Sequence, residues 1–447
     1  MGLQIAGGLV VTPRGVVGQD VVVEGERIRE LVEPGTTTNL RVLDATGCYV
    51  LPGGVDPHTH LMTDVEPAAR SAALGGTTTA ISFTLPEEGE TPAEALLRTR
   101  DELVPKAAVD VALHAYVSAP DRLTGADVAE VAELGATGIK LFTAYPELGL
   151  MASDRTVYET LRAAGPLGLP VLVHCENGGV IEALVDELLA AGKREARFFA
   201  ASRPPAVEIE AIARVLALAR LAEAPVYVVH ISTAGGLRQV EEARADGVPV
   251  AAEACTHHLA LDDSLHERAD AERFLTVPPL RPRSDVEALW RAVLDGTLDT
   301  IGSDHSQLRY QPPPADDFTG LPYGLRGIEA RVPLSLSLGR ARGVSYERLC
   351  DLLATAPARI FGLYPRKGAI LAGSDADLVV WDPDAVWWIE GDGPYAGLRV
   401  QGRIRAVLLR GAPLVEDGAW VGGKPCGRYV AVSRPGTKTP VPISGPT

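Results

Sequence analysis

The sequence lacks the features of several common protein classes. Its five cysteines are odd in number and contain no Cys-x-x-Cys spacing, so neither a disulfide framework nor a zinc ribbon is predicted, and we expect five reduced thiols. The net charge of -16 leaves no basic face for nucleic acid or an anionic membrane. These absences favour a protein that acts on a small molecule.

Long hydrophobic runs are also missing. No run reaches about 18 consecutive apolar residues, and the first residues, Met-Gly-Leu-Gln-Ile-Ala, contain no basic region followed by an apolar segment. We therefore expect a soluble, cytoplasmic protein without membrane contact. What the sequence does contain is 447 residues with 46% hydrophobic side chains, enough for a large core and more than one structural unit.

The middle of the chain repeats one pattern, in which short β-rich runs alternate with amphipathic helical stretches. The predicted strands are residues 48–60, 77–85, 109–117, 138–145, 170–177, 225–232, 248–257 and 300–306. The clearest helical stretches between them are residues 127–134, 180–191, 207–223 and 285–294. Eight βα units predict an α/β protein with a TIM-like (β/α)8 barrel over residues 51–364, whose active site lies at the carboxyl ends of the strands.

The two ends of the chain have a different, strand-like pattern. Residues 1–50 and 365–447 each contain too few strands for a stable sheet, so we expect them to pair into one small β-sandwich domain. The last twenty residues are rich in Pro, Gly, Ser and Thr, which predicts a poorly ordered tail or an arm onto a neighbouring subunit. We expect a homo-oligomer, either a dimer or a tetramer.

His58 and His60 are the first candidate metal ligands. Residues i and i+2 of an extended strand point to the same side, so both imidazoles can bind one metal ion. Two surface histidines on an edge strand are the alternative interpretation. Three further side chains follow predicted strands: His174, His230 and Asp304. Each could be a satisfied core histidine or a turn-capping aspartate, but together with the first pair they converge on one barrel mouth.

Lys140 lies inside the apolar fourth strand, Gly-Ile-Lys-Leu-Phe-Thr-Ala-Tyr. An ammonium group is costly inside a barrel, so this lysine is expected to become neutral and nucleophilic. It could form a Schiff base with a carbonyl substrate, or add carbon dioxide to give a carbamate that bridges two cations. A surface lysine that extends to solvent is the third possibility.

Five motifs together resemble those of the cyclic amidohydrolases, in particular dihydropyrimidinases and hydantoinases. They are Gly-Gly-Val-Asp-Pro-His-Thr-His, Gly-Ile-Lys-Leu-Phe-Thr-Ala-Tyr, Val-His-Cys-Glu-Asn, Val-His-Ile-Ser and Gly-Ser-Asp-His. The resemblance implies two divalent metal ions, with zinc expected first and Mn or Co able to replace it. By that similarity His58, His60 and Asp304 hold the more buried ion, His174 and His230 hold the other, and N6-carboxylated Lys140 bridges both.

The resemblance also implies an activity. A metal-bridging hydroxide would open a hydantoin or dihydropyrimidine ring to an N-carbamoyl amino acid, while the hydroxyl of Tyr145 stabilises the oxyanion and Asp304 transfers the proton. An allantoinase-like ureide hydrolase is the alternative enzyme, and a Schiff-base lyase using Lys140 is a more distant one. A non-catalytic binding protein similar to dihydropyrimidinases is the alternative outside catalysis, although its known examples lack the metal ligands.

The expected substrate contacts depart from the family pattern at two positions. Val277 stands where the family often has Ser, and Tyr323 stands where it usually has Asn. Dihydroorotases carry an Arg shortly after the His-x-His pair, whereas Leu-Met-Thr-Asp follows here. The apolar residues Met62, Leu148 and Leu150 are placed in loops over the mouth, which favours a hydrophobic ring substituent.

Five other polar residues near these motifs are expected to have supporting roles. We interpret His257 and His258 as structural, although a contact to a ligand or substrate is the alternative, and His114 as a satisfied core histidine. Glu176 and Asn177 follow His174 directly and could orient its ring.

Overall fold

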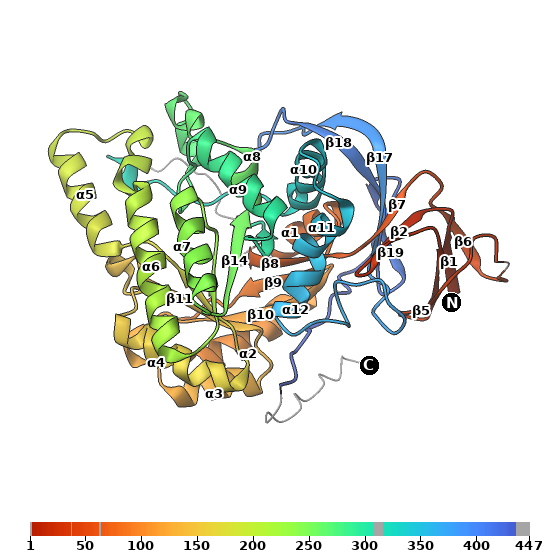
Figure 1. The fold of residues 1–447 in the computed structure, drawn as a ribbon, viewed down its shortest axis with the longest axis horizontal. Coiled ribbons are helices and arrows are strands. Elements are labelled where there is room, and N and C mark those ends of the chain that lie inside the picture. The colour runs from red at the N-terminus through yellow and green to blue at the C-terminus, as the bar shows by residue number, and fades with distance from the viewer. Residues whose placement is uncertain (1, 37, 62–63, 307–315, 435–447) are drawn as a thin grey trace.

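The computed structural model describes residues 2–36, 38–61, 64–306 and 316–434. Figure 1 shows two regions side by side: a strand bundle surrounded by helices, and a smaller region of β-sheet that contains the amino terminus. The carboxyl-terminal part of the described chain returns from the sheet region to the underside of the helical region (Figure 1).

The helical region is built around a nine-stranded parallel sheet. Its strands are β8 (Gly54–His60), β9 (Thr77–Phe83), β10 (Asp110–Tyr116), β11 (Gly138–Phe142), β12 (Val171–His174), β13 (Val226–Val228), β14 (Val250–Cys255), β15 (Thr300–Gly302) and β16 (His305–Ser306). The eighth predicted strand is interrupted: β15 pairs with β14, and β16 pairs with β8. The sheet therefore closes on itself as a TIM-like barrel, with Ser303 and Asp304 at the break.

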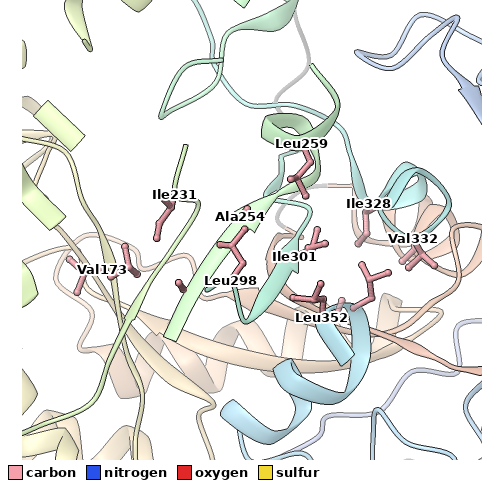
Figure 2. Packing of buried hydrophobic residues seen from close by; sticks show 14 of the residues in the cluster. Val173, Ile231, Ala254, Leu259, Leu298, Ile301, Ile328, Val332 and Leu352 are labelled. Carbon is pink, nitrogen blue, oxygen red and sulfur yellow. The ribbon is translucent and has the colours of Figure 1, made fainter. Parts of the chain in front are cut away.

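Helices cover the outside of this barrel (Figure 1). They are α1 (Val65–Leu74), α2 (Pro92–Leu103), α3 (Gly125–Glu133), α4 (Asp154–Ala164), α5 (Gly178–Ala190), α6 (Pro205–Ala222), α7 (Ala234–Ala245), α8 (Thr256–Ala260), α9 (Arg283–Asp295), α10 (Ile328–Ala341), α11 (Tyr346–Cys350) and α12 (Ala356–Ile360). Figure 2 shows strand residues Ala254 and Ile301 packed with Leu259 in the core between strands and helices. Because strand side chains alternate, the neighbours of Ala254 point into the barrel.

Two further sheets are built from the ends of the chain, a four-stranded sheet from the amino-terminal segment and a seven-stranded sheet from both ends. One has the order β5 (Arg27–Val32), β4 (Asp20–Glu24), β1 (Gly2–Ala6) and β6 (Arg41–Asp44). The other has the order β20 (Ala419–Trp420), β19 (Ala412–Glu416), β18 (Arg399–Leu409), β17 (Leu378–Trp388), β7 (Tyr49–Pro52), β2 (Leu9–Thr12) and β3 (Gly15–Val17). Strand β17 pairs with β7, so the expected pairing between amino- and carboxyl-terminal segments is observed.

The prediction of one strand over residues 48–60 was wrong. The run is divided at Gly53 into β7, which belongs to the seven-stranded sheet, and β8, which belongs to the barrel. The backbone of Gly53 passes so close to the side chain of Thr78 that a Cβ atom would collide with it. A continuous apolar run can therefore serve two sheets, because glycine permits the close approach at the crossing.

The end of the described chain also differs from the predicted tail. Val430 and Val432 are buried in a core cluster with Phe361, and the backbone of Val430 donates a hydrogen bond to Val111 of β10. Two apolar residues spaced by two place their side chains on the same side of this extended segment, which closes the amino-terminal end of the barrel. The remainder of the predicted tail, residues 435–447, lies outside the described residues.

Two expectations from composition can be compared with this fold. All five cysteines are free, and four of them are buried. Within residues 2–434, leaving out the gaps given above, no helix has the length and apolarity required to cross a membrane.

Candidate metal centre and active site

The predicted ligands converge on a cavity of about 470 Å³ at the carboxyl ends of the barrel strands. All six line it, and they are His58, His60, Lys140, His174, His230 and Asp304. The strands bring together residues separated by up to about 250 positions in sequence because parallel strands of a barrel share one carboxyl end. The structure thus places all six candidate ligands around one space.

His58, His60 and Asp304 form the first half of the site. Their ligand atoms lie within 4.8 Å of one another. The Oδ1 atom of Asp304 is 3.2 Å from Nε2 of His58 and 3.3 Å from Nε2 of His60. The histidines come from the end of β8, and Asp304 comes from the interruption between β15 and β16. Three donor atoms therefore face one point.

His174 and His230 form the second half. Nδ1 of His174 lies 2.9 Å from Nε2 of His230, and both side chains are buried. The other ring nitrogen of His174, Nε2, lies 2.9 Å from a carboxylate oxygen of Glu176. An ionised carboxylate only accepts hydrogen bonds, so this contact places the proton on Nε2 and leaves Nδ1 directed at His230.

Lys140 lines the same cavity as the two halves of the site, and its amine has no hydrogen-bond partner among the described residues. Its side chain is 1% exposed, and Nζ is one of the buried polar atoms without a partner in the described part of the chain. The rings of Phe83 and Phe142 flank it, with centroids 5.4 Å and 5.0 Å from Nζ. Burial lowers the pKa of Lys140 to about 8, because the surroundings do not solvate an ammonium group.

Three site residues have an unusual backbone conformation. Tyr145, His230 and Asp304 have positive φ angles of 65°, 38° and 46°. Non-glycine residues rarely adopt this region, and each such residue costs on the order of 1–3 kcal/mol. Strain of this kind persists where the surrounding contacts hold it, and here it coincides with side chains that face the cavity.

The ionisation of the site side chains follows from burial and from their neighbours. Burial alone would raise the pKa of Asp304, but the imidazoles of His58 and His60 reverse the effect, and the net shift is downward. Burial lowers the pKa of His60 and of His230, which favours neutral imidazoles able to bind a cation. Burial raises the pKa of Tyr145, so its hydroxyl remains a hydrogen-bond donor.

Comparison with known proteins decides the family. The sequence model of the Amidohydrolase family matches residues 49–414, most of the chain. The chain belongs to this family. It is 35% identical to a D-hydantoinase of Ralstonia pickettii, with 96% of this chain and 98% of that protein covered. It is 36% identical to a D-hydantoinase of Geobacillus stearothermophilus, with 95% of each covered.

A solved structure supports the same relationship. The crystal structure of dihydropyrimidinase from Brevibacillus agri superposes with a TM-score of 0.92 at 36% identity, covering 97% of this chain and 100% of that one. The resemblance inferred from the motifs is therefore confirmed, and this amidohydrolase is an enzyme of the cyclic amidohydrolase type.

Five predicted substrate-contact residues of this amidohydrolase contribute to the cavity wall. Tyr145, Leu148, Leu150, Val277 and Tyr323 all line it. The rings of Tyr145 and Tyr323 stack, with centroids 6.3 Å apart and planes inclined by 11°. Their roles toward a substrate stay predictions. Met62, the remaining residue of this set, lies outside the described residues.

The supporting polar residues take three different positions. His114 is a core histidine, as predicted, with its ring between the carbonyl of Pro57 and the hydroxyl of Thr137. His258 contacts the carbonyl of Pro278 at 3.0 Å, which agrees with a structural role. Asn177 does not orient His174: its side chain caps helix α5 and donates to Glu210.

His257, which follows strand β14, lies close to the cavity. His257 is fully buried, and its Nε2 lies 3.4 Å from the hydroxyl of Thr276, a residue that lines the cavity. His257 therefore reaches the cavity wall through Thr276.

Two buried charged residues of the site were missed by the sequence analysis. Glu253 of β14 contacts His58 at 2.7 Å, and Arg203 contacts Glu176 at 3.0 Å. Glu253 could have been predicted as a site residue, because it is the single charged residue in the apolar run Val-Ala-Ala-Glu-Ala-Cys and occupies an inward position of a barrel strand. Arg203 lies in a loop before helix α6, and no pattern in the sequence marks it.

Proposed function

We propose that this amidohydrolase is a binuclear metal-dependent hydrolase that opens a hydantoin or dihydropyrimidine ring to an N-carbamoyl amino acid. The observation that carries the proposal is the convergence of six ligand-type side chains on one barrel mouth, around a buried lysine amine without a partner. The names of its relatives, D-hydantoinase and dihydropyrimidinase, describe enzymes of such rings and support the same substrate class.

The donor set fits two zinc ions. Ligand nitrogen and oxygen atoms bind zinc at about 2.0–2.1 Å, so two ligands of one tetrahedral ion lie about 3.3 Å apart. The observed separations are 3.2 Å and 3.3 Å around Asp304, and 2.9 Å between His174 and His230. His58, His60 and Asp304 would hold one ion, and His174 and His230 the other. Neutral imidazoles with a carboxylate and no thiolate suit zinc, and also Mn or Co.

Lys140 would complete both coordination sets as a carbamate. A neutral amine adds carbon dioxide and releases one proton to solvent, which gives an anionic carbamate whose two oxygen atoms could both ligate cations. A pKa of about 8 leaves an appreciable neutral fraction near neutral pH. The alternative, a Schiff-base lysine, does not account for the four imidazoles and the carboxylate that surround the amine.

The protein's own side chains then have distinct tasks. When bound, the cations supply Lewis-acid polarisation of the ring carbonyl and lower the pKa of a water molecule. The hydroxyl of Tyr145 donates a hydrogen bond to the oxygen that gains charge. Asp304 faces both imidazoles with Oδ1, which leaves Oδ2 to accept a proton and deliver it to the leaving nitrogen.

The apolar part of the cavity wall would contact the substituent of the ring. Leu148 and Leu150, with Val277 on another loop, supply hydrophobic surface beside the stacked tyrosines. We propose that this surface favours an apolar substituent.

An allantoinase-like activity is the second candidate, since a ureide presents the same carbonyl and nitrogen to the same ligands. A non-catalytic binding protein is disfavoured, because all six ligand-type side chains are present.

The smaller region and the assembly are part of the proposal. We propose that residues 1–50 and the strands that follow residue 365 form one β-sandwich domain, supported by the shared core of Ile5, Val21 and Leu378 from both ends of the chain. The chain after β20 returns to the barrel, where Val430 and Val432 pack. We also propose that the enzyme works as a homo-oligomer.

The test is a substrate panel with metal analysis. Purified enzyme expressed with added zinc would be assayed on dihydrouracil, hydantoin, a 5-aryl hydantoin, allantoin and dihydroorotate. We expect about two ions per chain and the fastest hydrolysis on a hydantoin or dihydrouracil. Fastest hydrolysis of allantoin would select the second candidate, and a metal content near zero would reject the hydrolase proposal.

A further inference from the structure

Glu253 is a buried carboxylate whose contacts reach both halves of the metal centre. It is 0% exposed and lies in β14 next to Ala254, which points toward the helices (Figure 2). Its Oε1 accepts from Nδ1 of His58 at 2.7 Å and from the backbone N–H of His230 at 3.0 Å. Its Oε2 accepts from the hydroxyl of Tyr227 at 2.8 Å.

The first contact determines which nitrogen of His58 is available. The carboxylate only accepts hydrogen bonds, so Nδ1 of His58 carries a proton. The lone pair is then on Nε2, the atom that faces Asp304 at 3.2 Å. If the proton were on Nε2 instead, His58 could not bind a cation there. A carboxylate behind a ligand histidine also increases the basicity of the ring.

The second contact holds the backbone of His230. This residue has a φ angle of 38°, a conformation that non-glycine residues rarely adopt. The hydrogen bond from its N–H to Glu253 fixes the peptide group just before the imidazole that faces His174. One carboxylate thus holds a ring in one half of the site and a strained backbone in the other.

The corresponding carboxylate behind His174 is arranged differently. Glu176 contacts the His174 ring at 2.9 Å, but its charge is balanced by Arg203 at 3.0 Å. For Glu253, the described residues provide no ion pair with an arginine or lysine side chain within 4.0 Å. Its negative charge is therefore directed at the histidines and the cations they would hold.

We propose that Glu253 is a positioning residue that couples the two ion sites: it sets the tautomer of His58 and holds the backbone of His230, so that both ions depend on one carboxylate. This inference rests on the proposed metal centre and adds to it a residue outside the coordination sets. Glu176, in contrast, supports only the ion held by His174 and His230.

Two substitutions separate the charge of Glu253 from its shape. In Glu253→Gln, the amide oxygen can still accept from His58 and His230. Its NH2 group can donate to Tyr227, whose hydroxyl in turn reaches Thr300 at 2.6 Å. The geometry is kept while the charge is lost. Glu253→Ala removes both the charge and the three hydrogen bonds, which leaves the tautomer of His58 and the backbone of His230 unsupported.

The experiment measures zinc affinity of each site rather than activity. Zinc-loaded protein would be equilibrated against a graded chelator, and the occupancy of each ion would be read from anomalous scattering of crystals. We expect Glu253→Gln to weaken zinc binding by about 10- to 100-fold at the His58 site. We expect Glu253→Ala to weaken both sites by at least that factor.

Two control variants make the result specific. Glu176→Gln should weaken only the ion at His174 and His230. Asp110→Asn, at the opposite end of the barrel, should lower the Tm while both zinc affinities stay within twofold. If Glu253→Ala left the His230 site within twofold of the wild-type affinity, the coupling would be refuted. If Glu253→Ala did not fold, unchanged affinities in Glu253→Gln would refute the inference. A wild-type protein that binds no zinc would instead reject the proposed metal centre itself.

Discussion

Two lysines are buried to the same extent at opposite ends of the barrel, and their surroundings differ completely. Lys140 and Lys367 are each 1% exposed. Nζ of Lys367 contacts three carboxylates, Asp110 at 2.5 Å, Asp377 at 2.7 Å and Asp375 at 2.9 Å. Nζ of Lys140 has no such partner and lies between two phenylalanine rings.

The difference shows that burial alone does not decide what a lysine does. Burial opposes the charge of Lys367, but the three carboxylates raise its pKa above the usual value, so it is a permanent cation. The same burial without carboxylate partners lowers the pKa of Lys140 to about 8. The first lysine joins the segment after the barrel helices to β10, and the second is available for chemistry.

Substitution of Lys140 should have the largest effect. Lys140→Ala removes the proposed anionic bridge, so two cations would face each other with less negative charge between them, and at least one should be lost. We expect activity at background, partly restored by a small carboxylic acid. Metal analysis and hydrolysis assays would measure this.

Lys140→Arg provides the matched test of the carbamate. Guanidinium stays cationic and cannot add carbon dioxide, so this variant should fail as completely as the alanine. Retention of both metals and substantial activity by Lys140→Arg would show that the lysine acts as a simple cation, like Lys367.

Substitution of Lys367 should affect stability instead. Lys367→Met leaves three buried carboxylates without their shared cation, which should lower the free energy of unfolding by about 3–5 kcal/mol. Denaturant unfolding of the metal-free protein would measure it, with the exposed Lys106→Met as a control within about 0.5 kcal/mol. In a separate preparation with added zinc, folded Lys367→Met should keep its metals. Loss of metals at unchanged stability would contradict the assignment of Lys367 as structural.

Two tyrosines give a similar contrast in catalysis. Tyr145→Phe should keep both metals but lower kcat by roughly 10²-fold, because one hydrogen bond to the developing oxyanion is lost. Tyr429→Phe, whose hydroxyl lies at the other end of the barrel near the carbonyl of Gly135, should leave kcat unchanged. Steady-state kinetics would measure both. Equal kcat values in the two variants would remove Tyr145 from the mechanism.

The smallest effect concerns the pH dependence of the metal-free protein. The pKa of Lys140 is about 8 when folded and near 10.5 when unfolded, so between these pH values the unfolded chain binds more protons. Unfolding free energy should therefore rise with pH in this window, by about 1 kcal/mol between pH 8 and 9. Denaturant unfolding of wild type and Lys140→Met would isolate this term as their difference. A Lys140 that titrates like Lys367 would show no such difference.

The sequence predicted most of the site because the ligands occur at recognisable positions. His58 and His60 are spaced by two in a strand, and His174 ends another, so their convergence followed from the barrel topology. The interruption at Asp304 was not predicted, because a break between two pairings leaves the strand-like composition unchanged. Glu253 and Arg203 were missed since their importance lies in what they contact rather than in a local pattern.

By itself, the sequence determined the α/β barrel, the amidohydrolase family and the six candidate ligands, because strand periodicity and motif spacing are local properties of the chain. Only the tertiary structure decided that residues 48–60 serve two sheets, that Val430 and Val432 close the barrel, and that the two buried lysines differ. The physical reason is that burial, pKa and hydrogen bonding depend on neighbours that are distant in sequence. Lys140 and Lys367 acquire opposite properties from such neighbours alone.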